Sequence, residues 1–172
     1  TVSERAPSPT PPLTQRRILQ AWLPLAASWL LMGVEMPLFT AVAARLPDAA
    51  IHLAAYASIV LPVALIVEAP IIMLLAAATA LVKDGASYRK LHRFMTVSGV
   101  VLTIVHAAIA FTPLYDLLAG TLLEVPVEVR EPGRLGLKIM LPWTWAIAHR
   151  RMHQGVLIAH EQTRAVGIGT VV

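Results

Sequence analysis

Long runs of apolar residues constrain this chain more than any other feature of its sequence. Three of them cover residues 18–44, 53–82 and 94–112, and a fourth covers residues 135–159. A helix needs about 20 mostly apolar residues to cross a bilayer, and each run has about that length or more. Backbone polar groups inside lipid must be satisfied within the spanning segment, which favours helices. The sequence therefore predicts an all-α, polytopic membrane helix bundle.

The composition and charge of the chain agree with this prediction. Of the 172 residues, 57% are hydrophobic and 14% are charged, whereas soluble domains average about 45–50% apolar and about 25% charged residues. The formal net charge is +4, and the basic residues form short clusters between the apolar runs. This pattern is typical of loops that meet anionic lipid headgroups. We expect the lipid bilayer to be a partner and nucleic acid not to be one.

The two ends of the chain differ from its middle. Residues 1–15 contain four prolines within six positions, so we expect a disordered cytoplasmic tail before a transmembrane domain over residues 16–172. Residues 114–123 predict a short interfacial helix. The apolar residues from position 166 onward predict the start of a fifth span, so we expect this chain to be the N-terminal part of a longer protein.

The distribution of basic residues predicts the orientation in the membrane. If the N-terminus is cytoplasmic, ten of the 14 Lys and Arg residues fall in inner segments and four fall in outer segments. Cytoplasmic loops of membrane proteins carry such an excess. We therefore expect a multi-pass protein of the plasma membrane with its N-terminus in the cytoplasm.

Three ionisable residues inside the apolar runs are candidates for binding a coupling ion or substrate: Glu35, Glu68 and His106. Such a group costs about 2.5–3.5 kcal/mol at the bilayer centre unless it faces a partner or a cavity. The three positions fall at similar depth on successive spans, which predicts that they can meet in one cavity and bind a proton or a cation. The structural alternative is hydrogen bonding between helices, and for His106 taken alone we favour that alternative.

Prolines inside the spans favour the same kind of architecture. Pro24, Pro37, Pro62, Pro70 and Pro142 each remove a helix hydrogen bond, which predicts kinks. Broken helices line the binding sites of many transporters, although proline is also common in membrane helices generally.

A set of basic residues is predicted to form the inner face. Arg89, Lys90 and Arg93 lie in the loop before the third run, and Arg150 and Arg151 lie at the inner end of the fourth. They can attract an anionic substrate such as a phosphate or carboxylate. The interpretation that we favour is that they set the topology and contact lipid.

Motifs of soluble enzymes are missing from the sequence. His149 and His153 have the spacing of a helical metal pair, but the glutamate of a zinc-protease motif is absent. There is no phosphate-binding glycine loop and no cysteine nucleophile. We expect no enzyme activity, no catalytic residues, no metal and no cofactor.

Short motifs spread along the chain resemble those of a known transporter superfamily. They are Glu35 with Leu38, Asp48-Ala49, Leu53-Ala54-x-Tyr56, His106-x-x-Ile109-Ala110, Leu141-Pro142-Trp143, Arg150-Arg151-x-x-Gln154, Gly155-x-Leu157 and Gly167. The chain resembles the N-terminal third of proteins of the multidrug/oligosaccharidyl-lipid/polysaccharide (MOP) flippase superfamily. This group includes the multidrug and toxic compound extrusion (MATE) transporters, and the nearest branch is that of the progressive ankylosis proteins.

The resemblance implies two six-helix bundles that work by alternating access. Ankylosis-type proteins export small anions, and drug-extrusion relatives are antiporters that exchange organic cations for protons or sodium. Glu35 and His106 fall on matching positions, whereas Glu68 has no clear counterpart. We therefore expect a secondary transporter for efflux of a small organic molecule or anion, coupled to a proton or a sodium ion. A lipid-linked oligosaccharide flippase and a non-transporting membrane scaffold are the alternatives, and four spans with the start of a fifth cannot form twelve helices.

Overall fold

The computed structural model describes residues 14–160, 162, 165 and 166, without the side chains of Arg17, Ala21, Met32 and Glu35. Within this part of the chain every regular element is helical, so the prediction of an all-α fold is confirmed. The elements are α1 (Gln15–Ala43), α2 (Ala49–Ala55), η1 (Tyr56–Val60), α3 (Leu61–Ile72), α4 (Leu74–Leu81), α5 (Gly85–Phe111), α6 (Leu114–Leu117), η2 (Leu118–Leu122) and α7 (Val127–Ala159). The predicted tail before residue 14 and the predicted fifth span beyond residue 166 lie outside the described residues.

Three stretches of the described chain are helical, long and apolar enough to cross a membrane. They are Ile18–Ala43 in α1, Ala49–Leu81 from α2 to α4, and Gly85–Phe111, which is α5. The predicted fourth span, residues 135–159, is not among them. It lies within α7, whose charged, histidine and glutamine side chains lower its apolar character.

Helix α5 begins at Gly85 because Asp84 caps it. The Asp84 Oδ1 atom accepts a hydrogen bond from the Ser87 backbone N–H at 2.7 Å, and the Ser87 hydroxyl accepts one from the Asp84 N–H at 3.0 Å. This reciprocal arrangement satisfies donors that the first turn of a helix leaves open. The basic residues expected in the loop before the third run therefore belong to the first turns of α5.

The second apolar stretch is a helix with two local irregularities. In η1 the Leu61 N–H bonds to the Tyr56 carbonyl five residues earlier, which makes one wide π-helical turn. Pro62 follows at once and has no N–H to give, so the ladder of hydrogen bonds is interrupted there. A second interruption at Met73 separates α3 from α4 and follows Pro70.

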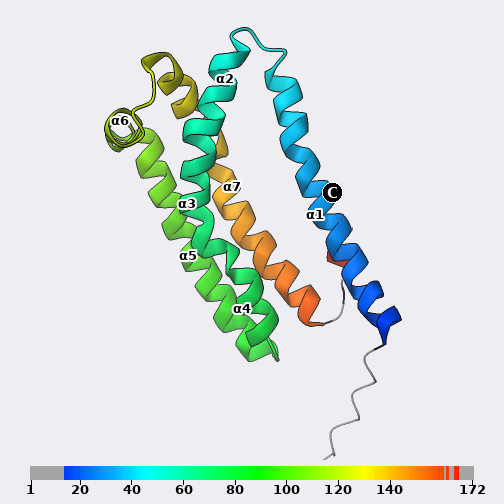
Figure 1. Ribbon diagram of the computed structural model, residues 1–172. Coiled ribbons are helices and arrows are strands. Elements are labelled where there is room, and N and C mark those ends of the chain that lie inside the picture. Colours follow the sequence, from blue (N-terminus) through cyan, green and yellow to red (C-terminus); the bar gives the residue numbers. More distant parts are fainter. Residues whose placement is uncertain (1–13, 161, 163–164, 167–172) are drawn as a thin grey trace, which may run out of the picture.

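Helix α7 occupies the centre of the arrangement and contacts α2, η1, α3, α4 and α5 (Figure 1). Glycines on α7 allow these close approaches. A Cβ atom on Gly136 would lie 2.6 Å from Cγ2 of Val60, and one on Gly155 would lie 2.5 Å from the Leu75 carbonyl oxygen. Small residues at helix contacts are typical of membrane proteins. The buried polar side chains of α7 are Thr144, Arg151 and Gln154, and these face protein.

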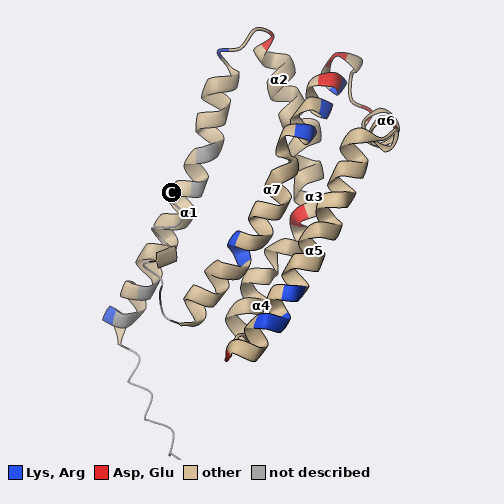
Figure 2. Cartoon of the chain, turned by 180° about the vertical axis from the view of Figure 1, so that it is seen from behind, with Lys and Arg blue, Asp and Glu red and all other residues tan. Residues whose placement is uncertain are grey.

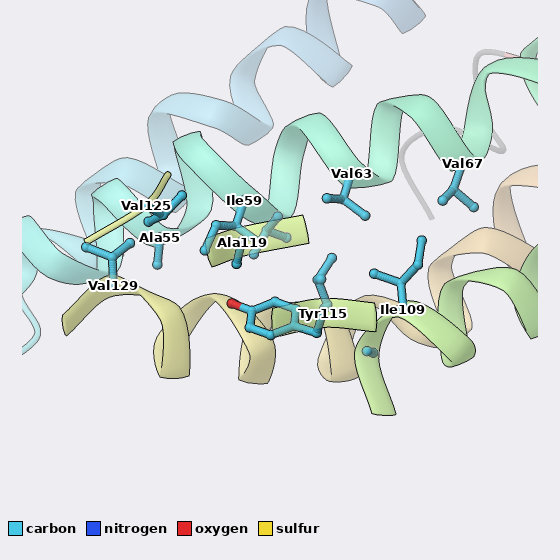
Figure 3. Packing of buried hydrophobic residues seen from close by; sticks show 12 residues of the cluster. Ala55, Ile59, Val63, Val67, Ile109, Tyr115, Ala119, Val125 and Val129 are labelled. Atoms are coloured by element: carbon cyan, nitrogen blue, oxygen red, sulfur yellow. The ribbon is translucent and has the colours of Figure 1, made fainter. Parts of the chain in front are cut away.

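One of the two apolar clusters lies where α2, η1 and α3 meet the end of α5 and the start of α7. Figure 3 shows Ile59, Val63 and Val67 on one side facing Ile109 and Tyr115 on the other. The Tyr115 hydroxyl donates a hydrogen bond to the Arg130 carbonyl. This bond joins α6, the short helix after α5, to α7.

Helix α1 lies at the side of this bundle (Figure 1). Its contacts include the ring of Phe39, whose centroid is 4.1 Å from that of Tyr56. Most of its described side chains are exposed, including Trp22 at 58% and Leu30 at 74%. Apolar exposure on this scale suits a helix surrounded by lipid or by further protein.

Candidate functional site

Glu68 is a carboxyl group buried in the middle of an apolar helix. It lies on α3 and is 7% exposed. Its Oε1 atom is buried and has no hydrogen-bond partner in the described part of the chain. Two groups of α7, the Trp143 side chain and the Arg151 guanidinium, lie near enough to this carboxyl to favour its ionised form. Burying an ionised carboxylate is expensive unless such groups compensate it.

Arg151 is the counter-charge to Glu68 and is itself buried, at 8% exposure. No direct ion pair joins the two groups, which are both among the described residues. The guanidinium carbon lies 5.6 Å from the centre of the Trp29 ring of α1, and its Nε atom has no described hydrogen-bond partner. Arg151 thus lies between α3 and α1 in the interior, apart from the exposed basic surface with which it was grouped.

His106 is completely buried on α5. Its Nδ1 atom lies 2.8 Å from the Thr144 hydroxyl of α7, which is also completely buried. Its Nε2 atom has no hydrogen bond of good geometry within the described residues, although the Leu137 carbonyl lies near the ring.

Glu68 and His106 are brought to one level of the bundle through α7. Their partners there, Trp143 and Thr144, are consecutive residues. Consecutive residues of a helix point in directions about 100° apart, so the two groups approach α7 from different sides. Glu35 lies in α1, and its side chain is outside the described part of the structure.

The inner basic residues divide into two sets. Arg89, Lys90 and Arg93 are exposed on the first turns of α5, and Arg150 is half-buried on α7. Figure 2 shows that many Lys and Arg positions lie toward the ends of the helices. The start of α1, the connection between α4 and α5, and the end of α7 lie at the same end of the bundle (Figure 1).

A group of aromatic and histidine rings joins α5 to α7 near these basic residues. The rings of His149 and His153 stack with centroids 4.0 Å apart. The Tyr88 hydroxyl is 3.4 Å from the His153 Nε2 atom, and the His92 ring lies 6.4 Å from that of His153. Among the described residues no group of three or more His, Asp or Glu side chains is arranged to hold a metal ion.

Several residues of the site were not predicted from the sequence. Trp29 and Thr144 were not singled out, and Trp143 and Gln154 were named only within the short motifs that carry the resemblance. A general signal for them exists, because a polar side chain within an apolar run needs a hydrogen-bonding partner. Comparison with protein-family models, with curated proteins and with solved structures gives no match.

Proposed function

We propose that this chain is part of a proton-coupled secondary transporter that works by alternating access, with Glu68 as the group that carries the coupling proton. The observation that supports this most is the buried Glu68 carboxyl, which has an unpartnered oxygen and a nearby but unbonded counter-charge. Ionisable groups inside membrane helices commonly mark ion pathways.

Two features of the site suit reversible protonation. When the carboxyl is ionised, the Trp143 side chain and the Arg151 charge stabilise it. When it is protonated, it avoids the high free-energy cost of a buried charge. Both forms are therefore supported by the same surroundings. The Arg151 charge opposes a sodium ion in the same place, so the proton is the coupling ion in this proposal.

His106 has a supporting role in this proposal. It is held by Thr144 in a fully buried contact between α5 and α7. A hydrogen bond of this kind fixes the relative position of two helices. The kinks expected at Pro62, Pro70 and Pro142 provide places where the helices can bend during alternating access.

The membrane arrangement completes the proposal. Helix α7 serves as a fourth span, in which the buried Thr144, Arg151 and Gln154 side chains face the helices around it. The protein lies in the plasma membrane, and the end of the bundle that contains the first turns of α5 faces the cytoplasm. The short motifs that resemble MATE-like proteins of the MOP flippase superfamily make export of a small organic molecule or anion the activity to test.

The test uses the full-length protein in proteoliposomes with an imposed pH gradient. Ethidium serves as a cationic probe and citrate as an anionic probe. We expect at least one probe to move against the proton flux and to speed the collapse of the pH gradient. Glu68→Gln cannot release a proton, so it should abolish coupled movement of the probe.

Glu128→Gln is the matched control, because it removes a carboxyl that is exposed in the first turn of α7. It should transport like the original protein. The proposal is overturned if Glu68→Gln retains full coupling, or if a sodium gradient drives movement of the probe while a pH gradient does not.

A further inference from the structure

The segment that follows α5 turns across the bundle instead of continuing along it. Helix α6 and the π-helical turn η2 together cover residues 114–122. In Figure 1 their coil is seen end-on, whereas α3, α5 and α7 run along the plane of the picture. Helix α5 is apolar and long enough to cross a membrane. A segment that lies across the end of such a helix runs along the membrane surface.

Three leucines of this segment are exposed on one face. Leu114, Leu117 and Leu122 are 46%, 60% and 76% exposed. Leu114 and Leu117 are three residues apart, which places them on the same side of an α-helix. In η2 the Leu123 N–H bonds to the Leu118 carbonyl five residues earlier, at 2.9 Å. Such a turn brings residues five apart to neighbouring positions, so Leu122 joins Leu117 on the same face.

The other sides of the segment are held by the bundle. Tyr115 and Ala119 are buried in the apolar cluster between α3 and α7, and the Tyr115 hydroxyl bonds to the Arg130 carbonyl. Asp116 forms an ion pair with Arg134 of α7 at 2.9 Å. These contacts fix how the segment is rotated. They leave its leucine face directed away from the helices that hold it.

The leucine face continues an exposed apolar surface of α5. Val97, Ile104 and Phe111 are spaced seven residues apart, which places them on one side of that helix, and they are 55%, 62% and 62% exposed. Phe111 ends α5, and Leu114 begins α6 three residues later. Since α5 is a candidate membrane span, the surface that continues from it along α6 meets the same surroundings, which are lipid. Short amphipathic helices with leucines on one face lie in the boundary between lipid headgroups and acyl chains.

The length of α7 agrees with a membrane boundary at the level of α6. Its 33 residues extend about 50 Å at 1.5 Å per residue, which exceeds the roughly 30 Å of a hydrocarbon core. Helix α7 begins beyond the level of α6 (Figure 1), and its first turns carry Glu128, Arg130 and Glu131. A boundary at α6 leaves these charges outside the hydrocarbon.

We propose that α6 and η2 form a membrane-surface helix whose Leu114, Leu117 and Leu122 side chains enter the bilayer at the boundary between headgroups and acyl chains. The sequence predicted an interfacial helix over residues 114–123, and the π turn that aligns the three leucines is a feature of the structure. In the proposed orientation this helix lies in the outer leaflet, because the first turns of α5 are at the cytoplasmic side. The choice of leaflet rests on that orientation. Insertion of the leucines depends neither on it nor on proton-coupled transport.

Site-directed spin labelling in phosphatidylcholine liposomes tests the inference, because the 172 residues contain no cysteine that would take up the label. A nitroxide is attached to Leu114→Cys, Leu117→Cys or Leu122→Cys. Its collisions with oxygen, which concentrates in lipid, are compared with its collisions with a water-soluble nickel chelate. We expect oxygen collisions to dominate at all three positions.

Glu128→Cys is the control, since Glu128 is exposed in the first turn of α7. Nickel collisions should dominate there, and the ratio of oxygen to nickel collisions should be several-fold lower than at the three leucine positions. All four positions are exposed, so the labels displace no packed side chain. Dominant nickel collisions at any of the three leucine positions place that side chain in water and overturn the inference. Few collisions with either reagent mean that protein covers the face, and dominant oxygen collisions at Glu128→Cys move the boundary beyond α6; each of these results also overturns it.

Discussion

The Nδ1 atom of His106 and the Oγ1 atom of Thr144 lie 2.8 Å apart, and neither residue has any exposed surface. This hydrogen bond joins α5 to α7 inside the bundle. Water cannot replace either partner there, so its loss leaves a polar group unsatisfied in an apolar interior.

Thr144→Val should therefore lower the stability of the protein although it keeps the shape of the side chain. We expect a loss of about 1–2 kcal/mol, because the His106 Nδ1 atom is then left without a partner. Unfolding in mixed micelles of maltoside and dodecyl sulfate, followed by tryptophan fluorescence, measures this. A double-mutant cycle with His106→Leu should give a coupling of about 0.6–1.7 kcal/mol. A coupling near zero would show that the bond is absent in the membrane protein.

The charges of Glu68 and Arg151 should be coupled in stability. Arg151→Met keeps a long stem against Trp29 but removes the counter-charge, so we expect a loss of roughly 1–3 kcal/mol. In the double variant Glu68→Gln/Arg151→Met no charge remains to be compensated, and most of that loss should be recovered. The same unfolding assay measures the four proteins. If the double variant is as unstable as the sum of the two single variants, the two groups do not interact.

Two glycine-to-alanine substitutions should change the stability of the protein in opposite directions. A Cβ on Gly155 would lie 2.5 Å from the Leu75 carbonyl oxygen and 2.6 Å from the Ala78 Cβ, whereas a Cβ on Gly33 would meet nothing within 4 Å. Gly155→Ala must push α4 away from α7, at a cost of about 1–3 kcal/mol. Gly33→Ala should stabilise α1 by up to about 1 kcal/mol through helix propensity. Melting temperatures in detergent compare the two, and a neutral Gly155→Ala would contradict the close contact.

The cap of α5 should depend on pH. Hydrogen bonds from the Ser87 backbone and hydroxyl lower the pKa of the Asp84 carboxyl below its ordinary value. A lowered pKa in the folded state means that the ionised cap adds stability above the ordinary range of aspartate. This contribution is lost as the pH falls through the lowered value.

The difference in melting temperature between the original protein and Asp84→Ala measures this contribution. It should be present at pH 6 and shrink toward pH 2. Because Asp84 is exposed, salt should reduce the part that comes from its charge. An equal difference at both pH values would mean that the charge of Asp84 has no role in the cap.

Part of the candidate site was predictable because charge inside an apolar run is conspicuous in a sequence. Glu68 and His106 were identified on that ground, and both are buried in the structure. Their partners Trp143, Thr144 and Arg151 were not assigned to them. Helices such as α3 are apolar around their whole circumference, so the spacing of apolar residues does not tell which side faces a neighbour.

The lengths of the apolar runs were enough to predict a set of helices able to cross a membrane, because a bilayer demands a fixed apolar length and internal backbone hydrogen bonds. They predicted four such spans, and three stretches of the described chain are helical, long and apolar enough. The start of α5 at Gly85, the central position of α7 and the meeting of α7 with Glu68, His106 and Trp29 were decided only by the tertiary structure. Those features depend on capping geometry and on how each helix is rotated against its neighbours. That rotation follows from the fit of side chains at places such as Gly155, where the backbone of another helix comes close.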